Sequence, residues 1–309
     1  MNYTLFGNND KKKGIKSPKN TLNDLTGKEW IFRTNSIDIF KSSNEDIELI
    51  KFILEIFESR YSTKGSESYA HHIRKIHPTP KPPQLMKFLI EFFSKENDLV
   101  YDPFMGVGGT LLGASLCNRK AIGIDLSEEY IEVYKNVCDF LKLEKQTTIL
   151  GNSKDLNKIT KLKELQFDLI MTDPPYFNMM AKKKSGESAK KKKDISPTPF
   201  TNNNEDIGNL PLKIFLDKLK SIINIGFRKL RNKRYVVLFT KDFQPSKEYH
   251  GMLHYDIITK LLEIEGLIYK GFKIWYDKSV NLYPYGYPYA YVGNQLHQYI
   301  IIFRKEIKE

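Results

Sequence analysis

The chain has 309 residues, of which 40% are hydrophobic and 13% aromatic, so it can bury one large core in a single principal domain. Its 49 Lys and Arg against 37 Asp and Glu give a formal net charge of +12, which favours a polyanionic partner such as nucleic acid. Two isolated cysteines, no apolar run near about 18 residues and no apolar signal core predict a soluble, cytoplasmic protein with no metal, no disulfide scaffold and no membrane contact.

The chain divides by composition into a tail and a main domain. Residues 1–60 form a polar, basic amino-terminal extension, which is typical of a solvated tail. Residues 61–309 form the main domain. It contains a basic insertion over residues 177–209 and a tyrosine-rich loop over residues 279–294. An insertion of this length is usually functional or disordered.

Strand and helix patterns alternate along the main domain. Strands are expected at Asp98–Phe104, Lys120–Leu126, Thr147–Leu150, Phe167–Asp173, Arg234–Thr240, Gly271–Asp277 and His297–Phe303. Helices are expected at Leu85–Phe93, Thr110–Leu116, Glu128–Leu141, Leu212–Leu230 and Ile257–Leu267. The alternation predicts an α/β fold with a Rossmann-like, doubly wound, seven-stranded sheet that is mostly parallel. The last two strands have no helix between them, which predicts an antiparallel C-terminal hairpin strand.

A glycine-rich turn follows the first predicted strand, in the stretch YDPFMGVGGT. Gly106, Gly108 and Gly109 allow a tight turn and a close backbone approach to a ligand at the start of a helix. Asp125 ends the next strand, where a carboxylate can accept hydrogen bonds from both hydroxyls of a ribose. Leu111 stands where the dinucleotide fingerprint requires glycine, so a nucleoside-containing cofactor is predicted and a nicotinamide is disfavoured.

Four motifs in a fixed order, HPTPKP, DPFMGVGGT, GIDLS and TDPPYF, resemble those of the S-adenosylmethionine-dependent DNA methyltransferases that modify adenine N6 or cytosine N4. The resemblance covers roughly residue 77 to the carboxyl terminus. It implies S-adenosylmethionine as the cofactor, with its methionine part beside the glycine turn and its ribose on Asp125. The cofactor-binding residues that it implies are Thr79, Lys81, Asp102, Pro103, Phe104, Gly106, Gly108, Thr110, Asp125, Leu126 and Asn152.

The adenine end of the implied cofactor site departs from the family pattern. The family usually carries an acid after the third strand, but this chain has Asn152 there and Asp155 three residues later. The sequence leaves open which of the two contacts the cofactor adenine.

The stretch after the fourth strand predicts the catalytic residues Asp173, Pro174, Pro175 and Tyr176. An exocyclic amino nitrogen is a poor nucleophile because its lone pair is delocalised into the ring. Two acceptors that hold the amino hydrogens localise that lone pair and orient it. Asp173 offers a side-chain oxygen, Pro174 offers a main-chain carbonyl, and Tyr176 offers a flat face on which an extruded base stacks.

Two loops at the same edge of the sheet are predicted to contact nucleic acid. Tyr285 and Tyr287 of the tyrosine-rich loop either stack on bases or pack the hairpin. The lysines of the basic insertion either neutralise phosphates or form a solvated loop. They are Lys182, Lys183, Lys184, Lys190, Lys191 and Lys192.

These observations predict a site-specific DNA methyltransferase that acts on a flipped-out base, with adenine N6 as the first choice. Cytosine-N4 methylation of DNA and guanine-N2 methylation of RNA are the alternatives, because the same grip on an amino group serves all three. The intact Asp173, Pro174 and Tyr176 disfavour a non-catalytic binding module. The expected partner is double-stranded DNA, with a cognate restriction endonuclease or a specificity partner as a further candidate. No segment resembles a separate recognition domain, so a short recognition site or loose specificity is expected.

Overall fold

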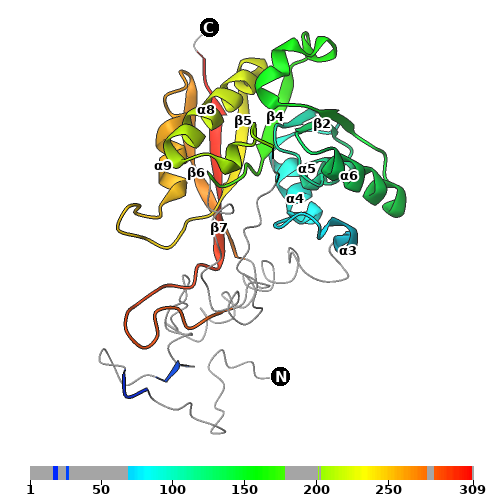
Figure 1. The fold of residues 1–309 in the computed structure, drawn as a ribbon. Helices are drawn as coiled ribbons and strands as arrows, with labels where there is room; N and C mark the ends of the chain where they lie inside the picture. Colours follow the sequence, from blue (N-terminus) through cyan, green and yellow to red (C-terminus); the bar gives the residue numbers. More distant parts are fainter. Residues whose placement is uncertain are drawn as a thin grey trace, which may run out of the picture.

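The computed structural model describes residues 17–19, 26–27, 69–177, 201, 203–276 and 282–307. Within this part of the chain a seven-stranded sheet has the order β3-β2-β1-β4-β5-β7-β6 (Figure 1). Neighbours from β3 to β5 pair in parallel, and β7 runs antiparallel to both β5 and β6. The predicted mostly parallel sheet with an antiparallel C-terminal strand is confirmed. The strands are β1 (Leu99–Asp102), β2 (Lys120–Asp125), β3 (Thr147–Leu150), β4 (Phe167–Thr172), β5 (Leu230–Thr240), β6 (Leu267–Tyr276) and β7 (His297–Lys305).

Helices cover both faces of the sheet. Along β1, Val100 packs into the cluster formed with α4, α5 and α6, whereas the next residue, Tyr101, packs into the cluster formed with α8 and α9. This alternation is the two-residue period of a strand. Burial on both faces explains why β4 is mostly apolar and is buried along its whole length. The helices are α3 (His71–Arg74), α4 (Pro83–Phe93), α5 (Gly109–Ser115), α6 (Glu128–Leu141), α8 (Leu212–Lys229) and α9 (Leu253–Leu261).

Short 3-10 helices stand where the sequence predicts no helix. The connection from β3 to β4 contains η1 (Ser153–Lys158) and η2 (Thr160–Leu162), and η4 (Ile207–Asn209) precedes α8. Asn152 caps η1, because its side chain accepts a hydrogen bond from the main-chain N–H of Lys154 at 3.0 Å. The cap fixes the backbone that follows β3, next to the ends of β1 and β2.

The helix expected at Ile257–Leu267 is wrong in position. It spans Leu253–Leu261, and the chain then closes i to i+3 turns from Ile264 to Leu261 and from Leu267 to Ile264. Apolar residues in such turns keep a helix-like spacing, so the pattern alone could not place the end. Gly266, at φ 80°, makes the left-handed turn into β6, which therefore begins four residues earlier than expected.

Several predictions concern residues outside this part of the chain. The lysines of the basic insertion, Lys182, Lys183, Lys184, Lys190, Lys191 and Lys192, lie outside the described residues, as does most of the extension over residues 1–60. Their role in binding nucleic acid stays a prediction. Among the described helices, none has the length and apolar character needed to cross a bilayer.

Candidate active site

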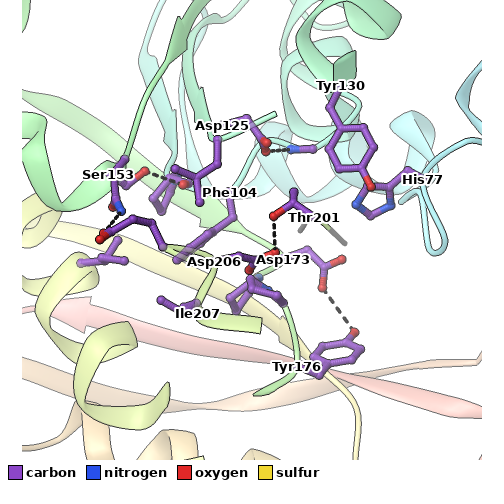
Figure 2. A pocket seen from close by; sticks show the side chains of 18 of the residues that line it. His77, Phe104, Asp125, Tyr130, Ser153, Asp173, Tyr176, Thr201, Asp206 and Ile207 are labelled. Carbon is purple, nitrogen blue, oxygen red and sulfur yellow. Dashed lines mark hydrogen bonds between the residues drawn. The ribbon is translucent and has the colours of Figure 1, made fainter. Parts of the chain in front are cut away.

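A cavity of about 670 Å³ opens at the carboxyl ends of β1, β2 and β4, and Figure 2 shows its side chains. Predicted cofactor residues line the cavity together with the predicted catalytic turn, Asp173 to Tyr176. The order of the strands therefore brings the glycine turn and the catalytic turn to the same cavity. The predicted residues in its wall are Thr79, Pro103, Phe104, Gly106, Asp125, Leu126, Asn152, Asp173, Pro174, Pro175 and Tyr176.

A second cavity, of about 310 Å³, adjoins the first. Thr79, Phe104, Gly106 and Asp173 line both cavities, so the two share a wall. The remaining predicted cofactor residues of the second cavity are Lys81, Asp102 and Thr110. Together the cavities contain every predicted cofactor residue except Gly108.

Gly108 has a packing role instead. Its φ of 76° lies in the left-handed region, and a Cβ there would stand 2.1 Å from the ring of Tyr134 on α6. The residue therefore permits the close approach of the glycine turn to α6, while Gly106 provides the cavity wall.

Asp102 ends β1 and is 2% exposed. Its Oδ1 accepts hydrogen bonds from the main-chain N–H of Phe104 at 3.0 Å and from the hydroxyl of Thr172 at 2.6 Å. Burial raises the pKa of Asp102 to about 6, although these hydrogen bonds act in the opposite direction. The carboxylate is therefore mostly ionised at neutral pH, on the wall of the second cavity.

Asp125 ends β2 and holds the glycine turn. Its Oδ2 accepts from the N–H of Gly106 at 2.8 Å, and its Oδ1 accepts from the N–H of Ser127 at 2.9 Å. Burial raises the pKa of Asp125 to about 6 as well. Each oxygen of a carboxylate has two acceptor positions, so both oxygens keep capacity for a ligand.

Asn152 and Asp155, the two candidates for the adenine contact, lie differently with respect to the cavities. Asn152 lines the larger cavity and donates from Nδ2 to Glu205 Oε2 at 3.1 Å. Asp155 forms an ion pair with Lys158 at 2.6 Å and does not line either cavity. Ser153 fixes this wall from behind by donating to the carbonyl of Pro103 at 2.6 Å.

Sequence reasoning missed the segment that returns to the cavity after the basic insertion. Asp206 is 5% exposed and lines the cavity opposite Asp125 (Figure 2). Its oxygens accept from the hydroxyl of Thr201 at 2.9 Å and from the N–H of Gly208 at 2.8 Å. The stretch TNNNED reads as a polar loop, and nothing in its local pattern indicates a cavity wall.

His77 was also missed as a site residue, although it opens the HPTPKP motif. It lines both cavities, and its ring stands edge-on to Tyr130 with the centroids 4.9 Å apart. Burial, with the charges of Lys81 and Arg74, lowers the pKa of His77 to about 3, so the imidazole is neutral. Its Nδ1 accepts from the N–H of Thr79 at 3.2 Å, which leaves the proton on Nε2.

The catalytic turn begins where β4 ends. Asp173 contacts Lys81, whose Nζ donates to Oδ2 at 2.5 Å, and Tyr176, whose hydroxyl donates to Oδ1 at 3.3 Å. Burial raises the pKa of Asp173, and the nearby Lys81 ammonium opposes that rise. Tyr176 is 8% exposed, and its ring lies edge-on to that of Phe243. Its expected stacking on a base stays a prediction.

In the tyrosine-rich loop, the most exposed rings are not the two predicted to contact nucleic acid. Tyr285 and Tyr287 are half-buried, and the Tyr287 hydroxyl accepts from the N–H of Ser17 at 3.0 Å. The exposed rings are Tyr289 and Tyr291, at 67% and 65%. Asn294 ties the base of the loop by bonding both the N–H and the carbonyl of Tyr283, at 2.9 and 2.8 Å.

The proteins similar to this chain include DNA and tRNA methyltransferases. The family described as DNA methylase, of the N6 and N4 type, matches residues 3–136. The type II methyltransferase M.HpaI of Haemophilus parainfluenzae is 44% identical over 71 residues, which are 23% of this chain and 23% of that protein. The tRNA (guanine(10)-N2)-dimethyltransferase of Methanocaldococcus jannaschii is 32% identical over 199 residues, 60% of this chain and 52% of that protein.

A solved structure also matches the fold. TrmN from Thermus thermophilus has a TM-score of 0.50 at 12% identity, over 77% of this chain and 53% of that chain. At this identity the likeness concerns the fold alone. The matched regions span between 23% and 52% of the lengths of the two curated relatives described above.

Proposed function

We propose that the chain is an S-adenosylmethionine-dependent DNA methyltransferase of the type that modifies exocyclic amino groups, and that it methylates adenine N6 in double-stranded DNA. The family match over residues 3–136 and the similarity to type II methyltransferases support this proposal. The observation that carries the proposal is the position of Asp173, which lines both cavities at once. A carboxylate at that shared wall can contact a base amino group while a cofactor occupies the adjoining space.

The residues of the two cavities fit S-adenosylmethionine. Asp125 keeps acceptor positions for ribose hydroxyls, and Asn152 and Asp206 offer polar atoms at the other wall of the larger cavity. Asp102 places a negative charge in the smaller cavity, which suits a cationic ligand end. When bound, S-adenosylmethionine supplies a methyl group activated by its sulfonium.

The chain's own contribution to the reaction is the grip on the amine. Asp173 accepts one amino hydrogen, and the Pro174 carbonyl is proposed to accept the other, so that the nitrogen lone pair is localised and oriented. Asp173 also takes up the proton that the nitrogen must lose on methylation. Tyr176 donates from its hydroxyl to the carboxylate, and its ring is proposed to stack on the base.

Guanine-N2 methylation of RNA is the second candidate. The observation that favours it is the long match to the tRNA (guanine(10)-N2)-dimethyltransferase, over 199 residues, against 71 residues for the type II DNA enzyme. A guanine N2 amine presents the same chemical problem as adenine N6, so the gripping geometry serves either base.

The test is methyl transfer from labelled S-adenosylmethionine to unmethylated duplex DNA and to unmodified tRNA, followed by nucleoside mass spectrometry. We expect N6-methyladenine in the DNA product. N4-methylcytosine or N2-methylguanosine would replace the proposal by one of the two alternatives, and no labelled product from either substrate would overturn it. A cognate restriction endonuclease is a further proposal, supported only by the type II methyltransferases among the relatives.

A further inference from the structure

The catalytic carboxylate forms a buried ion pair with a residue 92 positions earlier in the chain. Lys81 Nζ lies 2.5 Å from Asp173 Oδ2, and the two side chains are only 4% and 15% exposed. The resemblance implied that Lys81 closes the methionine end of the cofactor. The structure instead places its charge directly on the residue that is proposed to hold the amine.

Lys81 is fixed at both ends of its side chain. Its ammonium lies 5.6 Å from the ring centroid of Phe239 on β5 and 6.0 Å from that of Trp275 on β6, within the range of cation–π attraction. Its main-chain carbonyl accepts from Arg74 Nη2 at 2.5 Å, and Arg74 is 1% exposed. The lysine therefore cannot swing into solvent without breaking several buried contacts.

The other charged and titratable groups around Asp173 cannot replace this cation. Asp102 on β1 is an acid, and its charge and that of Asp173 oppose each other. His77 is held neutral, and Tyr176 donates a hydrogen bond without charge. Arg74 bonds the Lys81 carbonyl. Within the described residues, Lys81 is the cation at ion-pair distance from Asp173.

A buried carboxylate without a cation tends to take up a proton, because burial disfavours the charged form. A protonated Asp173 could neither attract the amino hydrogens strongly nor accept the proton released on methylation. The pair also leaves Oδ2 occupied by Lys81, whereas Oδ1, which accepts from Tyr176, keeps a second acceptor position for a ligand.

We propose that Lys81 is a positioning residue for methyl transfer, which keeps Asp173 ionised and turns its Oδ1 towards the incoming amine. The inference rests on the proposed function of this site. The amine nitrogen would gain the methyl group as the sulfonium–methyl bond breaks and leaves its electron pair on sulfur. The amine proton would pass to Asp173, which would then release it to water. Lys81 stays protonated throughout and does not exchange a proton with the substrate.

The test compares Lys81→Met, which keeps the length of the side chain without its charge, with Lys81→Arg, which keeps the charge. The rate constant of methyl transfer is measured from pH 5.5 to 9.5 at saturating S-adenosylmethionine and DNA. We expect the acidic limb of the Lys81→Met profile to move up by about one pH unit or more, with recovery at high pH. In Lys81→Arg the acidic limb of the pH–rate profile should lie closer to the wild-type position than it does in Lys81→Met.

A uniformly lower rate with an unmoved acidic limb would overturn the proposal, because a residue that only supports the fold or the cofactor would behave in that way. So would a loss of activity in Lys81→Met that a weaker cofactor affinity, measured by calorimetry, explains in full. Thermal melting by circular dichroism establishes that each variant is folded, and Lys81→Gln, which also lacks the charge, replaces Lys81→Met if that variant unfolds.

A second readout does not depend on activity. The carbon-13 carboxyl resonance of Asp173, assigned by its disappearance in Asp173→Asn, should titrate at a higher pH in Lys81→Met than in the wild type. If the wild type transfers no methyl group but this shift is seen, the proposed function fails while the role of Lys81 in holding Asp173 ionised stands. If the resonance does not move, the role of Lys81 fails whatever the activity.

Discussion

The two halves of the cavity are built in different ways. In the cofactor half, formed by the ends of β1 and β2, each carboxylate has one local partner: Asp102 bonds Phe104 and Asp125 bonds Ser127, each two residues away. Each also has a more distant partner, Thr172 for Asp102 and Gly106 for Asp125, 70 and 19 residues away. In the catalytic half, formed by Asp173 and Tyr176, the contacts span 92 residues to Lys81 and 122 residues to Gln298. The cofactor half therefore combines contacts within short motifs with a contact across the sheet, whereas the catalytic half depends mainly on contacts between distant segments.

Because of this difference, substitutions in the two halves should affect different measured quantities. A substitution in the cofactor half should change ligand affinity through the residue itself. A substitution in the catalytic half should change the rate, and remote residues that support Asp173 should share the effect. The following changes test that division, beginning with the largest expected effect.

Asp173→Asn should lower the rate of methyl transfer about 10²–10⁴-fold, the usual contribution of a positioned group that takes up a proton. The amide keeps an oxygen acceptor but neither the charge nor the capacity to accept the proton. Cofactor affinity should stay close to that of the wild type, because the ribose is assigned to Asp125 in the other half. Single-turnover kinetics and calorimetry measure the two quantities.

The matched control for this change is Asp217→Asn, which neutralises an exposed carboxylate on α8 that is paired with Lys260. It should leave both the rate and the cofactor affinity unaltered. Wild-type turnover by Asp173→Asn, or a parallel loss in the control, would remove Asp173 from its assigned role.

The cofactor half should show a distinct pH dependence of stability. The pKa of Asp102 is about 6 in the folded protein, above its ordinary value of 3.8, so the folded state binds the proton more tightly. Stability should therefore fall as the pH rises from about 4 to about 6, by about 2 to 3 kcal/mol for this group. Above that window the ionised, buried carboxylate destabilises the fold by a constant amount.

Asp102→Asn isolates this effect, because Oδ1 alone accepts the bonds from Phe104 and Thr172 and the amide retains that oxygen. The variant should equal the wild type in stability near pH 4 and exceed it near pH 7. Urea unfolding at a series of pH values measures the difference. Parallel stability curves for the two proteins would contradict the assignment of the raised pKa to Asp102.

The same division explains what could be predicted from the sequence. Seven strands, the glycine turn and the placement of Asp125 followed from apolar runs and fixed spacings, since these features depend on neighbouring residues. The contact of Lys81 with Asp173 and the return of Asp206 to the cavity have no local signal, because they arise only when distant segments meet at the edge of the sheet. The end of α9 was misplaced because buried 3-10 turns repeat the apolar spacing of a helix.

Asp125→Ala should weaken S-adenosylmethionine binding about 10- to 100-fold, the range for losing a hydrogen bond to a charged acceptor. It also removes the partner of the Gly106 N–H, so the melting temperature should fall. Asp125→Asn keeps one side-chain oxygen, so its affinity for S-adenosylmethionine should lie between that of the wild type and that of Asp125→Ala. Calorimetric titration measures the dissociation constant, and an unchanged value in Asp125→Ala would refute the ribose assignment.

The tyrosine-rich loop provides a test of whether residues outside the cavity also bind the DNA substrate. Tyr289 and Tyr291 are exposed, whereas Tyr287 is engaged with Ser17, so the first pair is available to stack on bases. Replacing either exposed ring by alanine should weaken DNA binding by about 1 kcal/mol, at the low end of base stacking. Tyr289→Phe and Tyr291→Phe keep the ring and should bind as the wild type does. Fluorescence anisotropy with a duplex at fixed salt measures the affinity. If the alanine variants match the phenylalanine variants, these rings do not contact DNA, and the catalytic half ends at the cavity.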